Sequence, residues 1–314
     1  VPSISGNNTV ITAAWGKTTD SLVPSYVTDK SAWSNNYHGA WHFQELTGST
    51  LADSGPKNHQ GTAVGDGVSV TTGQVGKGVS LDGSKDFVNF GRLAGNAGSV
   101  FTVSLWTKMT SGANLADSNA LIGNKSAEGA TSGWTLYKGE SSATRLSLKG
   151  SGAQLRYKSA VSNWNNGNWY YLAVAFNGGT GATVYSNGAA VGDMTGSINQ
   201  TVDSAEDLLL GHANYYNNKH WEGMFDEMRI ATGLRSADWI KAAYDNQKTS
   251  QSLVAYGSVS GPRIISSPLA ATATAGVPFT YATTAVGSPS AYTILNLPGG
   301  LQFGDSNGTI WGTP

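Results

Sequence analysis

The feature that most constrains this chain is a series of short runs rich in β-branched and aromatic residues, separated by Gly, Asn and Asp. In one such run, Phe101, Val103 and Leu105 recur at a period of two, while Thr102 and Ser104 face the other way. This is the pattern of a half-buried strand. The series predicts an all-β fold, with strands within the runs Gly78–Asp82, Phe101–Trp106, Gly133–Tyr137, Arg145–Leu148, Trp169–Phe176 and Ala182–Tyr185.

Two local signals add a hairpin and a helix to this series. Asn187 and Gly188 follow the run that ends at Tyr185, and both residue types tolerate the positive φ of a two-residue hairpin turn. Residues 236–245 are predicted to form a helix, because Ser236 can cap its start and Trp239 and Ile240 share an apolar face with Ala243.

Composition excludes several classes of function. The net charge is -1 and there is no run of Lys or Arg, so we expect no nucleic-acid partner. No stretch reaches the roughly 18 apolar residues of a membrane span, so we expect no membrane insertion. The absence of Cys removes disulfides and Cys-based metal sites. A Cys-free chain with 12% charged residues and many Gly, Thr and Asn is typical of exported bacterial proteins, so a secreted, extracellular or cell-surface location is expected.

The pattern of the chain changes twice. Residues 1–37 hold one clear strand, Thr9–Trp15, and residues 38–250 carry the long series of runs. From 251 to 314, spaced prolines and β-branched residues predict the short strands of an Ig-like sandwich. This last segment is shorter than the roughly 100 residues of a complete Ig-like domain, so a partial domain is predicted.

Ordered motifs in the middle segment resemble the laminin-G-like, or concanavalin-A-like, jelly-roll family of bacterial surface proteins. The match rests on the order and spacing of Trp41–Glu45, Leu51–Gly61, Gly76–Gly83, Phe101–Trp106, Asn168–Val174, Tyr185–Gly188 and Gly223–Ile230. The resemblance implies an antiparallel two-sheet jelly-roll sandwich.

The flanks also resemble known segments. Ile11–Trp41 resembles the tail of a domain of unknown function that precedes such jelly rolls, and the stretch from 262 resembles an Ig-like repeat that ends in motifs like Leu297–Phe303 and Gly308–Pro314. That repeat normally continues with closing strands. We therefore expect this segment to be truncated, or its edge to pair with a neighbouring domain or chain.

The family resemblance also implies a structural calcium ion between the Asp-Ser turn and the closing strand. By match, its ligands are Asp53, Asn58, His59 and Asp226. Calcium takes carboxylate, amide and carbonyl oxygens of this kind. The alternative is that Asp53 caps a turn and Asp226 accepts hydrogen bonds from backbone amides.

The best candidates for ligand contact lie in a loop that joins aromatics with Asn, Lys and His, the mixture that stacks on sugars and bonds their hydroxyls. They are Asn214, Tyr215, Tyr216 and Trp221, with Trp164 from a second polar-aromatic segment. The alternative is a long hairpin whose Trp221 folds back onto the sheet as a core residue.

Catalytic motifs are missing from the sequence. A Glu-x-Asp-x-x-Glu strand, which jelly-roll glycosidases use, does not occur, and neither does a Gly-x-Ser-x-Gly elbow. Asp226 and Glu227 are adjacent on a strand, so their side chains are expected to point to opposite faces. The chain is therefore predicted not to be an enzyme.

Two functions remain open. In the first, the chain is a non-catalytic carbohydrate-binding or adhesion module of a secreted or surface-anchored bacterial protein, and it binds a polysaccharide or cell-surface glycan. In the second, it is a structural spacer or protein–protein adhesion unit that binds no glycan. A remoter version of the first makes it an accessory module of a polysaccharide-degrading enzyme.

Overall fold

The computed structural model describes residues 29–93, 100–113, 119–124, 133–138, 144–150, 153–159, 166–177, 181–195, 205–213, 219–250, 265–268, 270–287 and 289–314. At 144–150, 153–159 and 193–195 only the backbone is described. The chain divides into two compact units, Val1–Leu253 and Val254–Pro314. The strand predicted at Thr9–Trp15 lies outside the described residues.

The first unit consists of two antiparallel sheets. Sheet A has the order β14-β13-β12-β7-β16-β5-β4, with β1 paired to β16, and sheet B has the order β11-β10-β9-β8-β15-β6-β3-β2. The strands of sheet A are β1 (Tyr37–Trp41), β4 (Ser69–Thr72), β5 (Lys77–Asp82), β7 (Val100–Met109), β12 (Tyr170–Asn177), β13 (Gly181–Ser186), β14 (Ala189–Thr195) and β16 (Glu222–Ala231). Those of sheet B are β2 (Thr50–Leu51), β3 (Gly61–Val64), β6 (Phe87–Asn89), β8 (Ala120–Gly123), β9 (Trp134–Lys138), β10 (Thr144–Gly150), β11 (Ala153–Ser159) and β15 (Leu209–Leu210).

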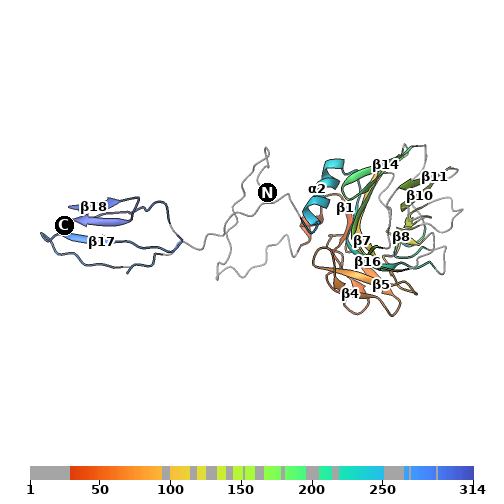
Figure 1. Ribbon diagram of the computed structural model, residues 1–314, viewed down its shortest axis with the longest axis horizontal. Coiled ribbons are helices and arrows are strands. Elements are labelled where there is room, and N and C mark those ends of the chain that lie inside the picture. The colour runs from red at the N-terminus through yellow and green to blue at the C-terminus, as the bar shows by residue number, and fades with distance from the viewer. Residues whose placement is uncertain are drawn as a thin grey trace. The chain divides into compact units, whose positions relative to one another are not determined.

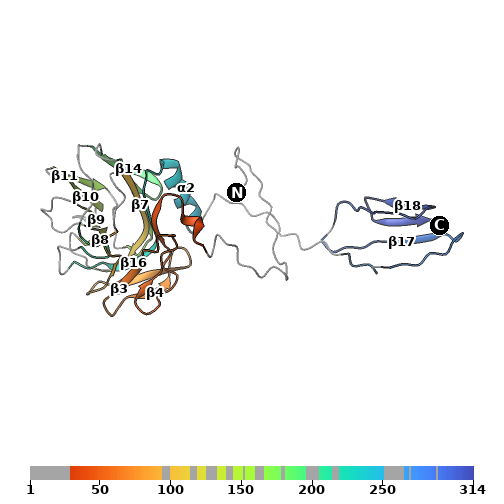
Figure 2. The same ribbon diagram turned by 180° about the vertical axis from the view of Figure 1, so that it is seen from behind.

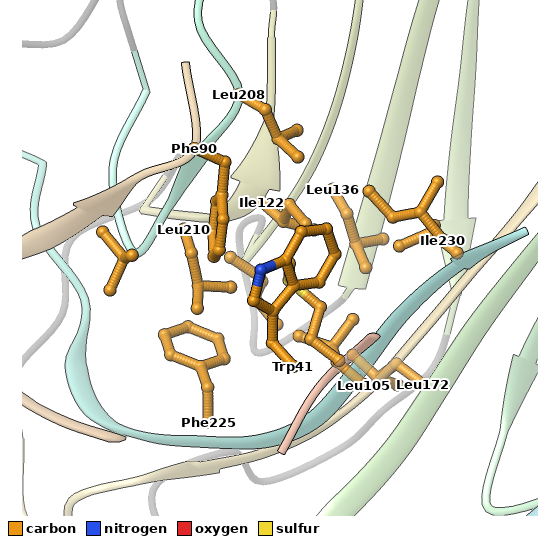
Figure 3. Packing of buried hydrophobic residues seen from close by; sticks show 14 of the residues in the cluster. Trp41, Phe90, Leu105, Ile122, Leu136, Leu172, Leu208, Leu210, Phe225 and Ile230 are labelled. Atoms are coloured by element: carbon orange, nitrogen blue, oxygen red, sulfur yellow. The ribbon is translucent and has the colours of Figure 1, made fainter. Parts of the chain in front are cut away.

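The two sheets face each other and enclose the main hydrophobic core, as a jelly roll requires. Strands β8, β10 and β11 lie in one layer and β7 in the other (Figure 1, Figure 2). Trp41, Phe225 and Phe90 lie within this core among leucines and isoleucines (Figure 3). Both Trp41 and Phe225 are 0% exposed, and the Trp41 indole nitrogen donates to the backbone oxygen of His59 at 2.7 Å, so the ring is buried without leaving its polar atom unpaired.

A helix covers the outer face of sheet A. Helix α2 (Ala237–Gln247) lies on the side of β7 away from sheet B (Figure 1, Figure 2). Ile240 is fully buried and packs with Trp106 and Tyr171 of the sheet in a second cluster. A short 3-10 helix, η1 (Ser31–Trp33), precedes β1. One outer face of the sandwich is thus covered by chain, which matters for where a ligand can bind.

Within the middle segment, the structure confirms the predicted strands, hairpin and helix. Asn187 and Gly188 have φ of 50° and 79° between β13 and β14, as the hairpin signal requires. Gly188 is also needed for packing, because an added Cβ would lie 2.9 Å from the Tyr244 ring of α2. The Ser236 hydroxyl accepts a hydrogen bond from the Trp239 amide at 3.1 Å, which is the predicted cap.

One prediction about β7 is wrong. Phe101, Val103 and Leu105 do face the core, but Thr102 and Ser104 on the other face are each only 2% exposed. The Thr102 hydroxyl donates to the Gly233 oxygen at 2.9 Å and accepts from the Arg235 amide at 2.9 Å. The segment that enters α2 therefore covers this polar face, so the strand is buried on both sides.

In the second unit, the described residues include a three-stranded antiparallel sheet of order β17-β19-β18. Its strands are β17 (Phe279–Ala282), β18 (Leu301–Gly304) and β19 (Thr309–Gly312). Several large apolar residues of this unit are exposed: Leu295, Val286 and Trp311, at 83%, 58% and 40%. The assignment of this unit as a partial Ig-like domain stays a prediction. Within the described part of the chain, no helix is long and apolar enough to cross a membrane.

Candidate functional site

The predicted ligand-contact residues divide into two groups. Asn214, Tyr215, Tyr216 and Trp164 lie outside the described residues. Trp221 is described and is 0% exposed, in the main core against Phe225, with ring centroids 5.8 Å apart. A fully buried indole has no face for a sugar to stack on. The prediction of Trp221 as a ligand contact is therefore corrected: the ring folds back onto the sheet as a core residue.

The two ends of the same loop bring three rings together. His212 follows β15, His220 precedes β16, and their imidazoles stack with centroids 4.3 Å apart and planes only 5° from parallel. The Phe87 ring of β6 lies 5.2 Å from His212 and 6.3 Å from His220. We call Phe87, His212 and His220 the imidazole patch. Phe87 and His212 are half-buried, whereas His220 is 6% exposed, so the accessible part of the patch belongs to the first two.

The imidazole patch lies on the outer face of sheet B. Val88 of β6 belongs to the main core, so strand alternation places Phe87 on the opposite face. The same argument applies to Tyr137 of β9, which follows the core residue Leu136 and packs against Ala120 and Ala213 in a separate small cluster. Phe87, Tyr137 and the ends of the loop thus share one face of this sheet.

Some buried polar side-chain atoms on or next to β8 and β9 have no hydrogen-bond partner among the described residues. The Asn119 amide donates to the His220 backbone oxygen, which ties the loop to β8, but its Oδ1 has no partner among the described residues. The Asn124 Nδ2 and Thr135 Oγ1 likewise have no partner among the described residues. All three side chains are 3% exposed or less. Buried polar atoms are nearly always paired. Because these three are shielded from the surface, they are not placed to contact a bound glycan.

Within the imidazole patch, the His212 side chain favours its uncharged form. Burial, together with the neighbouring His220, lowers the pKa of His212, against a smaller raising effect of the Lys219 backbone oxygen. A neutral imidazole offers one donor and one acceptor, the combination that sugar hydroxyls use.

The predicted calcium ligands do not come together as one set. The Asp53 carboxylate accepts hydrogen bonds from the amides of Ala40, Gly55 and His59, at 2.9, 2.7 and 2.9 Å. The Asn58 Oδ1 accepts from the Lys30 ammonium at 2.8 Å.

Asp226, the fourth predicted ligand, belongs to a different set of contacts. Its Oδ2 accepts from the Val75 amide at 2.8 Å and its Oδ1 accepts from the Glu227 amide at 2.7 Å. None of these partners is shared with Asp53. Among the described residues no group of three or more His, Asp or Glu is placed to hold a metal. The residues as arranged do not fit the predicted calcium ion, and the alternative roles, a turn cap and an acceptor of backbone amides, match these contacts.

The expectation that the side chains of Asp226 and Glu227 point to opposite faces of the sheet is wrong. A bulge interrupts the pairing of β16 with β7 between Asp226 and Arg229, and Glu227 has a φ of 49°. Gln247 of α2 contacts both Glu227, at 3.0 Å, and Trp106, the partner of Asp226 on β7. Both carboxyl groups therefore lie on the outer face of sheet A, because the bulge breaks strand alternation.

The pKa values of these two carboxyl groups shift in opposite directions. Burial raises the pKa of Asp226 to about 7, and the adjacent Glu227 adds to the increase. Burial acts in the same direction on Glu227, but the hydrogen bond from His42 at 2.6 Å and the charge of Arg229 outweigh it and lower its pKa. All four carboxyl oxygens accept hydrogen bonds, and the side chains are 0% and 5% exposed, so the pair is not placed to meet a substrate.

The sequence contained a usable signal for the imidazole patch. His212 and His220 stand at the two ends of one loop, and the Trp221 amide donates to the Gly211 oxygen at 2.8 Å, which holds these ends together. Phe87 had no such signal, because only the pairing of β6 with β15 brings it next to His212.

Fold and site together define a lectin-like jelly-roll sandwich. The family model described as the concanavalin A-like lectin/glucanases superfamily (Laminin_G_3) matches residues 82–241, about half of the chain. The chain belongs to this superfamily. No curated protein sequence matches it significantly.

Solved structures show the same fold at low identity. Domain 4 of AbnA, a GH43 extracellular arabinanase from Geobacillus stearothermophilus in complex with arabinotriose, has a TM-score of 0.53 and 20% identity, over 66% of this chain and 98% of that domain. The binding domain of Paraclostridial Mosquitocidal Protein 1 has a TM-score of 0.55 and 16% identity, over 67% and 52% of the two chains.

A third similar structure is the binding domain of Botulinum Neurotoxin DC in complex with SialylT. Its TM-score is 0.52 with 14% identity, over 68% of this chain and 52% of that one. The present chain thus spans about half the length of these toxin binding domains. At these identities the likeness shows the fold.

Proposed function

We propose that this jelly roll is a non-catalytic carbohydrate-binding module of a secreted or surface-anchored bacterial protein, and that it binds a polysaccharide or cell-surface glycan on the outer face of sheet B. The observation that carries the proposal is the imidazole patch, in which the half-buried rings of Phe87 and His212 lie together on that face. The half-buried Phe87 ring offers a stacking surface for a sugar, and the half-buried His212 imidazole offers a donor and an acceptor.

The non-catalytic part of the proposal rests on the carboxyl groups. Asp226 has the raised pKa that a general acid needs, but it is 0% exposed and both of its oxygens accept from backbone amides. Glu227 is held by His42, Arg229 and Gln247. Glu227 instead joins sheet A to α2 through Gln247, and Asp226 holds the backbone at Val75 against β16. The arabinotriose complex of the similar arabinanase domain is in keeping with a binding role.

One observation favours the alternative, a spacer or protein–protein adhesion unit without glycan binding. That alternative expects the aromatics of the loop to be buried, and Trp221 is buried. A glycan-binding experiment distinguishes the two functions.

The experiment is a glycan-array screen of the purified chain, followed by affinity measurements on the glycan that binds. Phe87→Ala removes a half-buried ring of the imidazole patch and is expected to weaken binding about tenfold, since a ring contact of ~1.4 kcal/mol corresponds to that factor. Trp169→Ala is the matched control: Trp169 is also half-buried but packs on the outer face of sheet A, so affinity is expected to stay unchanged.

Thermal melts of both variants check that the fold is retained. Equal loss of affinity in the two variants would contradict the assignment of the site to sheet B. If the chain binds no glycan on the array, the carbohydrate-binding proposal fails and the spacer or adhesion role replaces it.

A further inference from the structure

A lysine ammonium lies among oxygens of the predicted calcium turn. Lys30, just before η1, is partly buried, and its Nζ donates to the backbone oxygen of Asp53 at 2.7 Å and to Oδ1 of Asn58 at 2.8 Å. A backbone carbonyl and an amide oxygen are also ligand types that calcium prefers. The cation that these oxygens meet here is supplied by the chain itself.

The turn is organised so that it presents these oxygens outward. The Asp53 carboxylate accepts three backbone amides and is 1% exposed, so its negative charge stays inside the turn. Asn58 has a φ of 56°, a conformation that Asn tolerates better than most residues. Because the carboxylate is occupied inside the turn, the Asp53 carbonyl and the Asn58 amide oxygen remain to accept hydrogen bonds from the Lys30 ammonium.

We propose that the Lys30 ammonium takes the place of a calcium ion in this chain, and that it fastens the segment before β1 to the Asp53–His59 turn. The ammonium already occupies the Asp53 carbonyl and the Asn58 amide oxygen, and a divalent ion would have to displace Nζ from both. Asp226, which the family resemblance adds as a further ligand, is bound to Val75 and Glu227 instead. The proposal does not depend on sugar binding.

The anchor also positions the residues that follow it. Lys30 has a φ of 61°, a left-handed conformation that is unfavourable for Lys and that its two hydrogen bonds help to hold. Three residues later, the Trp33 ring lies 4.8 Å from the Arg229 guanidinium and 5.1 Å from the His42 ring. Arg229 and His42 both contact Glu227, which Gln247 of α2 also contacts. The Lys30 anchor therefore connects the predicted calcium turn to the contacts of Glu227 under α2.

The test compares thermal unfolding of the full chain in calcium and in excess chelator. For the wild type we expect the same Tm in both buffers and no heat of calcium binding by calorimetry. In chelator, Lys30→Met is expected to lower the Tm by a few degrees, because two charge-assisted hydrogen bonds are lost. Lys57→Met is the matched control, since Lys57 is exposed on the same turn, and its Tm is expected to equal that of the wild type.

A double-mutant cycle then tests the partner. Asn58→Gly removes the amide but accommodates the positive φ, and its effect is expected to be smaller in the Lys30→Met background than in the wild type. Additive effects of the two substitutions would overturn the proposed contact. A wild-type Tm that rises in calcium and falls in chelator, or a Lys30→Met variant as stable as the wild type, would overturn the replacement of the ion.

Discussion

At the scale of single residues, the same amino-acid type serves different purposes according to where strand pairing places it. Trp41 and Trp221 are both 0% exposed core residues, whereas the half-buried Phe87 is left at the surface of sheet B. Residue type alone does not distinguish a core aromatic from a surface one. The aromatic content predicted both a large core and a binding platform, and only the fold shows which ring belongs to which.

The pKa of Asp226 leads to a prediction at this scale. Its value of about 7 in the folded chain lies above the ordinary 3.8, so the folded state holds an extra proton between about pH 4 and 7. The contribution of this group to the free energy of unfolding is therefore largest at low pH and falls as the pH rises through this window. Urea unfolding of the wild type and of Asp226→Asn across the window measures it.

Asp226→Asn cannot ionise, so its stability is expected to decline less between pH 4.5 and 7 than that of the wild type. Glu227 has the opposite sign: its lowered pKa contributes stability that is lost below its ordinary value of 4.5, at the acid end of the comparison. Parallel pH profiles of the two proteins would show that Asp226 does not titrate in this window.

At the scale of elements, helix α2 closes the outer face of sheet A. Gln247 near its end accepts from the Trp106 indole at 2.7 Å and donates to Glu227 at 3.0 Å, and Ile240 fills the cluster below it. The helix begins where Ser236 caps the Trp239 amide. Its position therefore depends on a cap at one end and on buried polar contacts at the other.

Removal of the cap is expected to weaken this closure. Ser236→Ala should lower the free energy of unfolding by about 1 kcal/mol, which corresponds to a Tm lower by roughly 2–4 °C in a chain of this size. Ser236→Asp keeps a capping oxygen and serves as the control, with a Tm close to that of the wild type. Differential scanning calorimetry compares the three proteins, and an unchanged Tm for Ser236→Ala would show that the cap is unimportant.

The elements that could be predicted are those with a local signal. The period-two pattern at Phe101, Val103 and Leu105 and the Asn187–Gly188 turn both specify backbone geometry within a few residues, and the structure has that geometry. The bulge at Glu227 could not be predicted, since a Glu with positive φ depends on tertiary contacts with His42, Arg229 and Gln247. Burial of Thr102 depends likewise on the segment entering α2.

At the scale of the whole molecule, the two outer faces of the sandwich differ. Sheet A is covered by α2, and polar residues there such as Thr102 and Glu227 are buried and hydrogen-bonded. Sheet B leaves the rings of Phe87 and His212 half-buried at its outer face. This asymmetry is why the binding proposal is placed on sheet B, a face that the sequence pointed to only through the loop between His212 and Trp221.

The most direct test of this placement is an NMR titration of the isotope-labelled imidazoles with the glycan selected on the array. The chain has five histidines, and only His212 and His220 belong to the imidazole patch. We predict that added glycan shifts the signals of these two while those of His42 and His59 stay unchanged. Shifts confined to His42 or His59, or saturating binding that moves neither His212 nor His220, would contradict a glycan site on the outer face of sheet B.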